Sequence, residues 1–434
     1  VANNPKRVLQ QAAARASEKH SAEHLLYAAN RLAIRDAPAT ADLWRSVTKR
    51  YDIPTTEDHA ILRRIGIAAA QDYEPRAAGL LEQVPDQAAD ERVIEWRART
   101  AMREGRWGDV LRIIAAMPSA LSASERWRYW EATALKETGQ TEVAEALMAV
   151  LATERSYYGF LAADVSGLPY AFDHAELDVS DERLAALAND PQLVRARELF
   201  AVDQPARARA EWQRALRGRA AVDKAAAAEL AHRWQWHSEA ITLLGELQSW
   251  DDLDIRYPLA YQDWIAEHAG RASVRSAWVY GITRSESLFT RDIRSSAGAW
   301  GLMQLMPATG KRVAREAGIT WQGIDTLKDA ELNIALGTRY LAYLQDRFSH
   351  PALATAAYNA GPHRVQRWLP DTTPMRADVW IETIAYDETR AYVQRVLSAD
   401  IIFQWRMGEP VQRLADILTP VAPKQSVAQT VTPL

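Results

Sequence analysis

The sequence contains no cysteine among its 434 residues, which excludes disulfide bonds, thiol catalysis and cysteine-based metal sites. Its net charge at pH 7 is only −4, so it presents no basic field for nucleic acid. No apolar run approaches the roughly 20 residues of a membrane-spanning helix. No EF-hand loop is present either, and we predict neither a metal site nor a cofactor.

No segment of useful length alternates polar and apolar residues, so nothing in the sequence favours β-strands. Instead, Ala, Leu, Arg and Glu dominate, and apolar residues recur at i, i+3 and i+4 along almost every segment. We therefore predict an all-α protein. A chain of 434 residues should form two or three domains.

The 16 tryptophans are many for this length, and some of them mark a repeat. Trp96 is followed nine residues later by Gly105, and Trp130 nine residues later by Gly139. The two helix–Gly turn–helix units are thus offset by 34 residues. Such units stack into a superhelix because a single hairpin cannot bury its apolar face alone. A non-repeating bundle that happens to share the spacing is the alternative.

Changes of composition divide the chain into predicted domains. Helical repeats occupy 1–170, and a polar stretch punctuated by proline at 171–191 is the linker. A Trp-rich helical unit follows at 192–255, and a third domain spans 256–418. Residues 419–434 lack periodicity and predict a flexible tail.

The most informative acid is Glu286, which follows the apolar segment Ala277–Ile282. A carboxyl group at the end of a buried helix is partly desolvated, which favours its protonated form and suits a general acid. For Glu286 alone, an ion pair with Arg284 or Arg291 on a helix surface is the simpler explanation. The following residues favour the first interpretation.

Residues 295–301 are rich in small residues, and their glycines allow a close approach of the backbone to a ligand. We predict a helix from Leu302 to Ala317, with Met303 and Gln304 at its start and facing this turn. Met303 would form an adaptable apolar wall, and Gln304 would hydrogen-bond a sugar. Core packing and helix capping are the alternative roles.

Two further segments, Ala356–Pro362 and Trp380–Val393, combine helical patterns with isolated polar groups. The first joins a small-residue helix to a Gly-Pro stop. The groups with hydrogen-bonding capacity here are Tyr358, Asn359, Tyr386 and Glu388. A capped helix end and a salt-bridged helix start are the alternatives.

Taken in order, these segments resemble soluble lytic transglycosylases of the Slt type, which are family 1 peptidoglycan lyases with a goose-lysozyme-like catalytic domain. The resemblance extends along the whole chain, since the helix pairs around 91–165 resemble the superhelical U domain, 192–255 the linker L domain, and 256–418 the catalytic domain. The motifs that carry it are Glu286-Ser287, Gly301–Gln304, Ala357–Gly361 and Tyr386–Val393.

The resemblance implies a role for each matching residue. Glu286 would be the sole catalytic acid and base, and Ser295 would contact the N-acetyl group of muramic acid. Met303 and Gln304 would line the sugar subsites, and Tyr358 would hydrogen-bond beside the acid. The remaining expected substrate-binding residues are Asn359, Tyr386 and Glu388, the last shaping the groove near the reacting sugar.

The sequence departs from the family pattern at four positions, which are Ser285, Trp300, His363 and Ala385. None of them removes a catalytic group, but Trp300 and His363 would change subsite shape or peptide preference. The helical-repeat region is also shorter than the family norm. We therefore expect an N-terminally incomplete superhelix, which argues against a closed ring.

Most glycosidases use two carboxylates, whereas the resemblance implies one. Glu286 would protonate the glycosidic oxygen between MurNAc and GlcNAc and then take the proton of the MurNAc C6 hydroxyl, leaving a 1,6-anhydro-MurNAc end. Asp292, the next acid, is predicted to lie at the surface. The alternatives are a muramidase that adds water and a glycan-binding helical scaffold without turnover.

The implied substrate places the protein in the periplasm of a Gram-negative bacterium. No signal-like segment opens the sequence, as expected for a mature form, a fragment or a cytoplasmic protein. We expect a monomer that binds peptidoglycan glycan strands, with cell-wall synthases as candidate protein partners.

Overall fold

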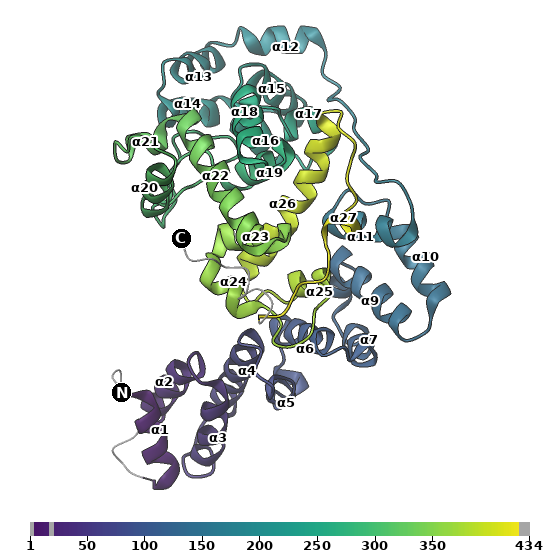
Figure 1. Cartoon of the computed structure of the whole chain (residues 1–434), viewed down its shortest axis with the longest axis vertical. Coiled ribbons are helices and arrows are strands. Elements are labelled where there is room, and N and C mark those ends of the chain that lie inside the picture. Colours follow the sequence, from purple (N-terminus) through teal and green to yellow (C-terminus); the bar gives the residue numbers. More distant parts are fainter. Residues whose placement is uncertain (1–3, 17–20, 425–434) are drawn as a thin grey trace. The chain divides into compact units, whose positions relative to one another are not determined.

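The computed structural model describes residues 4–16 and 21–424 (Figure 1). Within these residues the chain forms helices and three isolated β-bridges, with no strand. The predicted all-α fold is confirmed. The chain divides into two compact units, the first formed by Val1–Tyr170, His363–Ala391 and Leu418–Leu434, and the second by Ala171–Pro362 and Tyr392–Ile417.

The first unit consists mainly of helical hairpins. Its helices are α1 (Pro5–Ala14), α2 (Ala22–Ala33), α3 (Ala37–Val47), α4 (Thr55–Gln71), α5 (Ala77–Glu82), the 3₁₀ helix η1 (Asp86–Ala88), α6 (Glu91–Arg103), α7 (Trp107–Ala115), α8 (Ser119–Ser122), α9 (Glu125–Glu137), α10 (Thr141–Leu151), α11 (Tyr157–Ser166), α24 (Pro362–Trp368) and α25 (Ala377–Glu382).

The helix–Gly turn–helix units predicted from the tryptophan spacing are present. Helix α6 packs on α7 and α9 on α10, with Gly105 and Gly139 at the turns. Trp96 and Trp130 are both fully buried, so each tryptophan acts as a wedge between neighbouring helices. The repeat was visible in the sequence because the same buried position recurs in each hairpin.

A buried carboxylate holds the second segment of the first unit against the hairpins. Glu382, at the end of α25, is 1% exposed and accepts hydrogen bonds from Arg99 Nε at 2.9 Å and from the Tyr158 hydroxyl at 2.5 Å. Burial alone would raise the pKa of Glu382, but the charges of Arg99 and Arg126 outweigh it and lower this pKa to about 2.

Neighbouring backbone groups are held in the same way. The Tyr73 hydroxyl donates to Thr383 O and Gln71 Nε2 to Ala385 O, both at 2.9 Å. Val421, in the predicted flexible tail, is fully buried and exchanges two backbone hydrogen bonds with Met375. The tail is therefore anchored at this point, and its residues 425–434 lie outside the described residues.

The second unit contains the remaining helices. These are α12 (Asp181–Ala188), α13 (Pro191–Ala201), α14 (Pro205–Leu216), α15 (Ala221–Arg233), α16 (His237–Glu246), α17 (Leu253–Arg256), α18 (Gln262–Ala272), α19 (Ser276–Ser287), α20 (Pro307–Glu316), α21 (Asp325–Lys328), α22 (Ala330–Phe348), α23 (Pro351–Ala360), α26 (Asp387–Arg406) and α27 (Leu414–Ile417). The division between the units falls inside α26.

Two packing regions organise the second unit. Trp212 and Trp236 centre a cluster formed by α12 to α17, where the Trp-rich helical unit was predicted. The other region joins α18, α19, α22, α23 and α26, and Figure 1 shows α22 between α18 and α23. Within residues 4–16 and 21–424 no helix is long and apolar enough to cross a membrane. The predicted domain boundaries stay a prediction.

Loss of the Glu382 charge should destabilise the first unit in a pH-dependent way. The pKa of Glu382 falls from 4.5 to about 2 on folding, so its contribution to stability is complete above pH 4.5 and is lost as pH falls towards 2. We expect Glu382→Gln to cost about 3–5 kcal/mol at pH 7, because it removes the buried carboxylate shared by Arg99 and Arg126 and leaves Arg99 with Glu95 as its remaining carboxylate. Urea unfolding followed by circular dichroism between pH 2 and 7 measures both effects.

Glu104→Gln is the matched control, because Glu104 is 38% exposed and forms a surface ion pair with Arg106. It should change stability by no more than about 1 kcal/mol. Equal losses in the two variants would contradict the role given to Glu382.

Candidate active site

Glu286 is the second-last residue of α19, which is the position expected from the sequence. The predicted apolar segment Ala277–Ile282 is buried along its whole length, and Glu286 itself is half-buried. The chain leaves the helix through Leu288 and Phe289, both with positive φ of 48° and 64°. Two bulky residues in this conformation are uncommon, and such backbone is concentrated at functional sites.

Tyr392, in α26, donates a hydrogen bond from its hydroxyl to Glu286 Oε1 at 2.6 Å. Its side chain is only 2% exposed. Burial and the adjacent charge of Glu286 raise the pKa of Tyr392, so the phenol stays neutral and remains a donor. Tyr392 was not among the predicted site residues. It lies in the Tyr386–Val393 motif, 106 residues from Glu286 along the chain.

The close crossing of α19 and α26 makes this contact possible. A Cβ atom on Gly281 would lie 3.0 Å from Val396 O, which is a tight contact, so the absence of a side chain at residue 281 favours this close approach of the helices. Nearby, the rings of Tyr280 and Phe403 stack with their centroids 4.8 Å apart. The backbone contact and the aromatic stack together set the position of Tyr392 relative to Glu286.

Tyr358, unlike Tyr392, was predicted from the sequence, and the charge of Glu286 acts on it as well. Its hydroxyl donates to Met303 O at 2.8 Å, and burial and the charge of Glu286 raise its pKa. Asn359, the next residue in α23, is half-buried. The charge of Glu286 therefore acts on the Tyr358 hydroxyl, and the hydrogen bond of that hydroxyl holds the backbone at Met303.

The helix predicted from Leu302 to Ala317 begins later in the structure than the sequence suggested. Residues 301–304 form a turn, and α20 begins at Pro307. Trp300 and Leu305 exchange two backbone hydrogen bonds of 3.0 Å across the turn, which a helix would not allow. Proline is favoured in the first turn of a helix because it needs no hydrogen-bond acceptor there, and it marks the true start.

The buried side chain of Asn333 organises this turn. Its Oδ1 accepts from Met303 N at 2.8 Å, and its Nδ2 donates to Trp300 O at 3.0 Å and to Leu327 O at 2.8 Å. Asn333 is fully buried, so these bonds satisfy an amide that would otherwise destabilise the core. No local pattern pointed to this residue in the sequence.

The three residues predicted to line sugar subsites from this region have different environments. Met303 is fully buried, with its sulfur against Gly337, so the alternative role in the core fits it. Gln304 Nε2 donates to Ile293 O and Gly301 O, so its amide nitrogen holds the backbone of the turn and does not cap a helix. Ser295 Oγ accepts from Ala299 N at 2.9 Å. The methionine exposed here is Met306, at 44%.

The other two candidates, Tyr386 and Glu388, belong to the first unit. Both are exposed, and the ring of Tyr386 packs edge-on against Trp368 with centroids 5.1 Å apart. Ligand contacts of all the candidate residues stay predictions.

Comparisons with known proteins identify the family to which this chain belongs. A family model described as "Transglycosylase SLT domain" matches residues 263–380, and one described as "Soluble lytic murein transglycosylase L domain" matches residues 186–253. An inactive mutant of the lytic transglycosylase Slt from Pseudomonas aeruginosa superimposes with a TM-score of 0.88 at 37% identity, covering 95% of this chain and 67% of that chain. This chain belongs to the Slt-type lytic transglycosylases.

Two further relatives show how much of this chain and of each relative is covered by the similarity. The 70-kDa soluble lytic transglycosylase of Escherichia coli has a TM-score of 0.84 at 26% identity, covering 97% of this chain and 69% of that one. The soluble lytic murein transglycosylase of Salmonella typhimurium is 32% identical over 75% of this chain and 50% of its own length. The chain spans about half the length of the curated relatives it matches.

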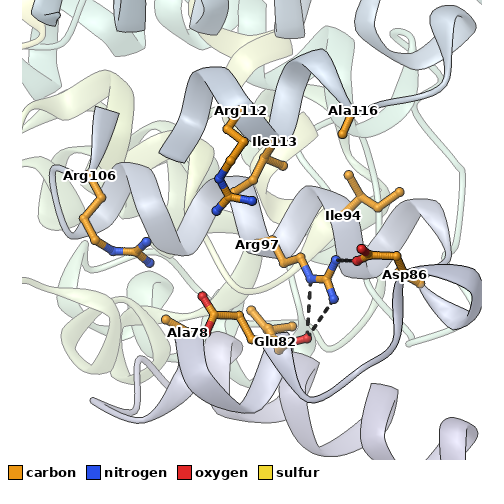
Figure 2. A pocket seen from close by; sticks show the side chains of 11 residues that line it. Ala78, Glu82, Asp86, Ile94, Arg97, Arg106, Arg112, Ile113 and Ala116 are labelled. Carbon is orange, nitrogen blue, oxygen red and sulfur yellow. Dashed lines mark hydrogen bonds and ion pairs between the residues drawn. The ribbon is translucent and has the colours of Figure 1, made fainter. Parts of the chain in front are cut away.

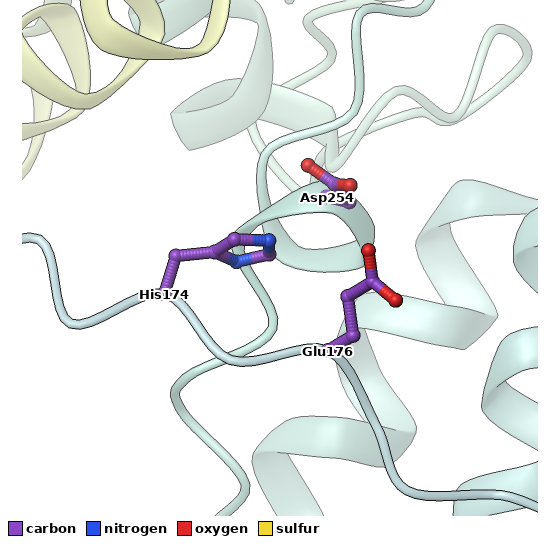
Figure 3. A group of neighbouring side chains, drawn as sticks. All are labelled: His174, Glu176 and Asp254. Carbon is purple, nitrogen blue, oxygen red and sulfur yellow. The ribbon is translucent and has the colours of Figure 1, made fainter.

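A group of metal-binding side chains also occurs in this Slt-type chain, although none was predicted. His174, Glu176 and Asp254 can each offer a ligand atom within 4.8 Å of the others (Figure 3). However, Asp254 pairs with Arg406, and Leu253 N donates to His174 Nδ1 at 3.1 Å. Because the protein's own groups already use Asp254 and the Nδ1 atom of His174, we assign no metal here.

The Gly301 turn provides a test of how the candidate site is supported. A Cβ on Gly301 would lie closer than 3.0 Å to Asn333 Nδ2 and Leu327 O, whereas one on Gly298 would meet nothing within 4 Å. Both glycines have positive φ, of 80° and 91°, so alanine costs about 1–2 kcal/mol of backbone strain at either position. Gly301→Ala should cost a further 1–3 kcal/mol or so through overpacking.

Chemical denaturation of Gly301→Ala and its matched control Gly298→Ala measures the difference. Equal destabilisation would show that the Asn333 contact does not support the turn.

Proposed function

We propose that this protein is a peptidoglycan lytic transglycosylase that cleaves the MurNAc–GlcNAc bond without water and leaves 1,6-anhydro-MurNAc ends. The observation that carries the proposal is the hydrogen-bonded pair of Glu286 and Tyr392 at the end of a buried helix, in a chain of the Slt family. Relatives named as soluble lytic murein transglycosylases support the same substrate.

In this mechanism one carboxyl group acts twice. The Glu286 carboxylic acid gives its proton to the glycosidic oxygen as the bond from that oxygen to C1 of MurNAc breaks. The substrate's own N-acetyl group stabilises the positive charge on C1. The Glu286 carboxylate then takes the proton of the MurNAc C6 hydroxyl, whose oxygen bonds to C1, and the acid is regenerated. The attack is intramolecular, so it gains from proximity.

The two tyrosines fit this cycle because they can hydrogen-bond without titrating. The raised pKa of Tyr392 keeps its hydroxyl protonated, so it stabilises the Glu286 carboxylate formed after the first proton transfer. Tyr358 is neutral for the same reason and can keep its hydrogen bond to Met303 O throughout. Glu286 is then the group at this pair that exchanges protons with the substrate.

The proposed substrate implies the setting in which the protein works. Intact peptidoglycan lies outside the cytoplasm, so we propose a periplasmic location in a Gram-negative bacterium. We further propose a monomer, with cell-wall synthases as candidate partners. The helical hairpins of the first unit would provide a surface for long glycan strands or for such partners.

Replacement of the acid tests the catalytic assignment. Glu286→Gln should lower turnover of purified sacculi by at least about a thousandfold, because the amide cannot supply the proton. Binding of glycan strands should persist. Glu267→Gln is the matched control, since Glu267 is exposed on α18 and pairs with Arg271. Activity of Glu286→Gln within tenfold of the wild type would rule out the assignment.

The mass of the products separates the lyase from the muramidase alternative. We expect muropeptides that are lighter by one water than reducing-end products, because the C6 hydroxyl and not water attacks C1. Mass spectrometry of a digest of sacculi measures this directly. Reducing ends would favour hydrolysis, and the absence of any product would favour a glycan-binding scaffold.

A further inference from the structure

The first unit contains a cavity of about 500 Å³ that the proposed catalytic site does not use. It is formed by α2, α4, the start of α6 and the end of α24 together with residues 385–386, and we call it the arginine cavity. Its charged lining residues are Arg63, Arg64, Arg92, Arg367, Asp72 and Asp90. Four guanidinium groups thus face two carboxylates, which makes the cavity positive.

The arginines of this cavity are weakly paired within the fold. Arg63 stands 3.7 Å from Asp90, and Arg367 stands 3.7 Å from Asp72. These distances exceed the range of about 2.7–3.2 Å for an N–H···O hydrogen bond. Arg64 is exposed and has no ion-pair partner among residues 4–16 and 21–424. Arg63 Nη1 donates to Ala88 O at 3.0 Å and Arg92 stands 4.0 Å from Asp387, which leaves the other donors of these arginines available to a ligand.

In a second cavity of the same unit, the arginines are hydrogen-bonded or ion-paired within the protein. It has a volume of about 410 Å³ and is also lined by arginines (Figure 2). There Arg97 donates to Leu81 O, Val84 O and Asp86, while Arg112 pairs with Asp109. These guanidinium groups serve the fold itself, so this cavity supplies controls and not a site.

The walls of the arginine cavity are partly apolar and are held in place. Tyr386 is 42% exposed and Ile34 is 56% exposed, so both can contact a ligand. Gln71 Nε2 holds Ala385 O at 2.9 Å, and Arg103 donates to Trp368 O at 3.3 Å. A cavity with fixed walls, a few apolar groups and converging charges is typical of a preformed binding site.

We propose that the arginine cavity binds a short peptide with free carboxylate groups, of the kind that murein carries on its glycan strands; the source of the peptide rests on the proposed function. Guanidinium groups recognise carboxylates through two parallel hydrogen bonds that are strengthened by the opposite charges, which a neutral amide lacks. Tyr386 and Ile34 suit small aliphatic side chains. The volume suits a few residues and is too small for a folded partner.

Binding of matched peptides to the whole chain tests this inference. Isothermal titration calorimetry should detect acetyl-Ala-Glu-Ala, which carries two carboxylates, and should show at least about tenfold weaker binding of the neutral acetyl-Ala-Gln-Ala-amide. Raising the salt concentration from 0.05 to 0.5 M, values chosen to shorten the screening length, should weaken only the first. Equal affinities for the two peptides, or no binding of either, would overturn the inference.

Single substitutions locate the binding. Arg64→Gln and Arg367→Gln should each weaken binding of the acidic peptide about tenfold, because each removes charge-assisted hydrogen bonds. Arg112→Gln is the matched control, since Arg112 is 69% exposed and lines the other cavity. Melting curves show whether each variant is folded. A loss of binding in Arg112→Gln, with none in Arg64→Gln, would place the peptide elsewhere.

The same protein separates this inference from the proposed function. Glu286→Gln should bind the acidic peptide as the wild type does. Turnover of sacculi without peptide binding would overturn the inference alone, and peptide binding without turnover would overturn the proposed function alone. Binding of a 20-residue polyglutamate more than tenfold tighter than the tripeptide would point to an acidic protein partner and overturn the peptide assignment.

Discussion

The contact between the backbones of α19 and α26 at Gly281 is the constraint on which the candidate active site depends. Helix α19 ends at the acid, and α26 carries the tyrosine that donates to it. A Cβ at position 281 would lie 3.0 Å from Val396 O, so a side chain there would require the two helices to shift by a few tenths of an ångström. The stacked rings of Tyr280 and Phe403 support the same crossing. A hydrogen bond of 2.6 Å tolerates little displacement, so the acid and its donor are positioned by helix packing.

The Asn333 turn supplies the second support of the site. One buried amide holds Trp300, Met303 and Leu327 by their backbone groups, and Tyr358 holds Met303 from the other side. Met303 is therefore important for its backbone, while its side chain fills the core. This arrangement explains why polar residues far apart in the chain meet at one turn, and why glycine is required where the turn approaches Asn333.

The first unit uses charge in two ways. Around Glu382 the arginines are buried and matched to a carboxylate, which specifies how residues 382–385 lie on the hairpins. Such buried pairs add little net stability compared with apolar packing, but they penalise any other arrangement that leaves a charge unpaired. In the arginine cavity the guanidinium groups stand away from their acids, and this spare capacity distinguishes a binding surface from a structural one.

The sequence by itself determined the helical class, the repeated hairpins, the burial of Ala277–Ile282 and the position of Glu286 at the end of that helix, because these depend on local periodicity and on motif spacing. It misplaced the helix start at Leu302, since the pairing of Trp300 with Leu305 competes with helix formation. Only the tertiary structure revealed Tyr392, Asn333, the burial of Met303 and the group around His174. Those roles arise where segments distant in the chain pack together. Sequence periodicity predicts which face of a helix is buried, but it does not predict which residues of other segments pack against that face.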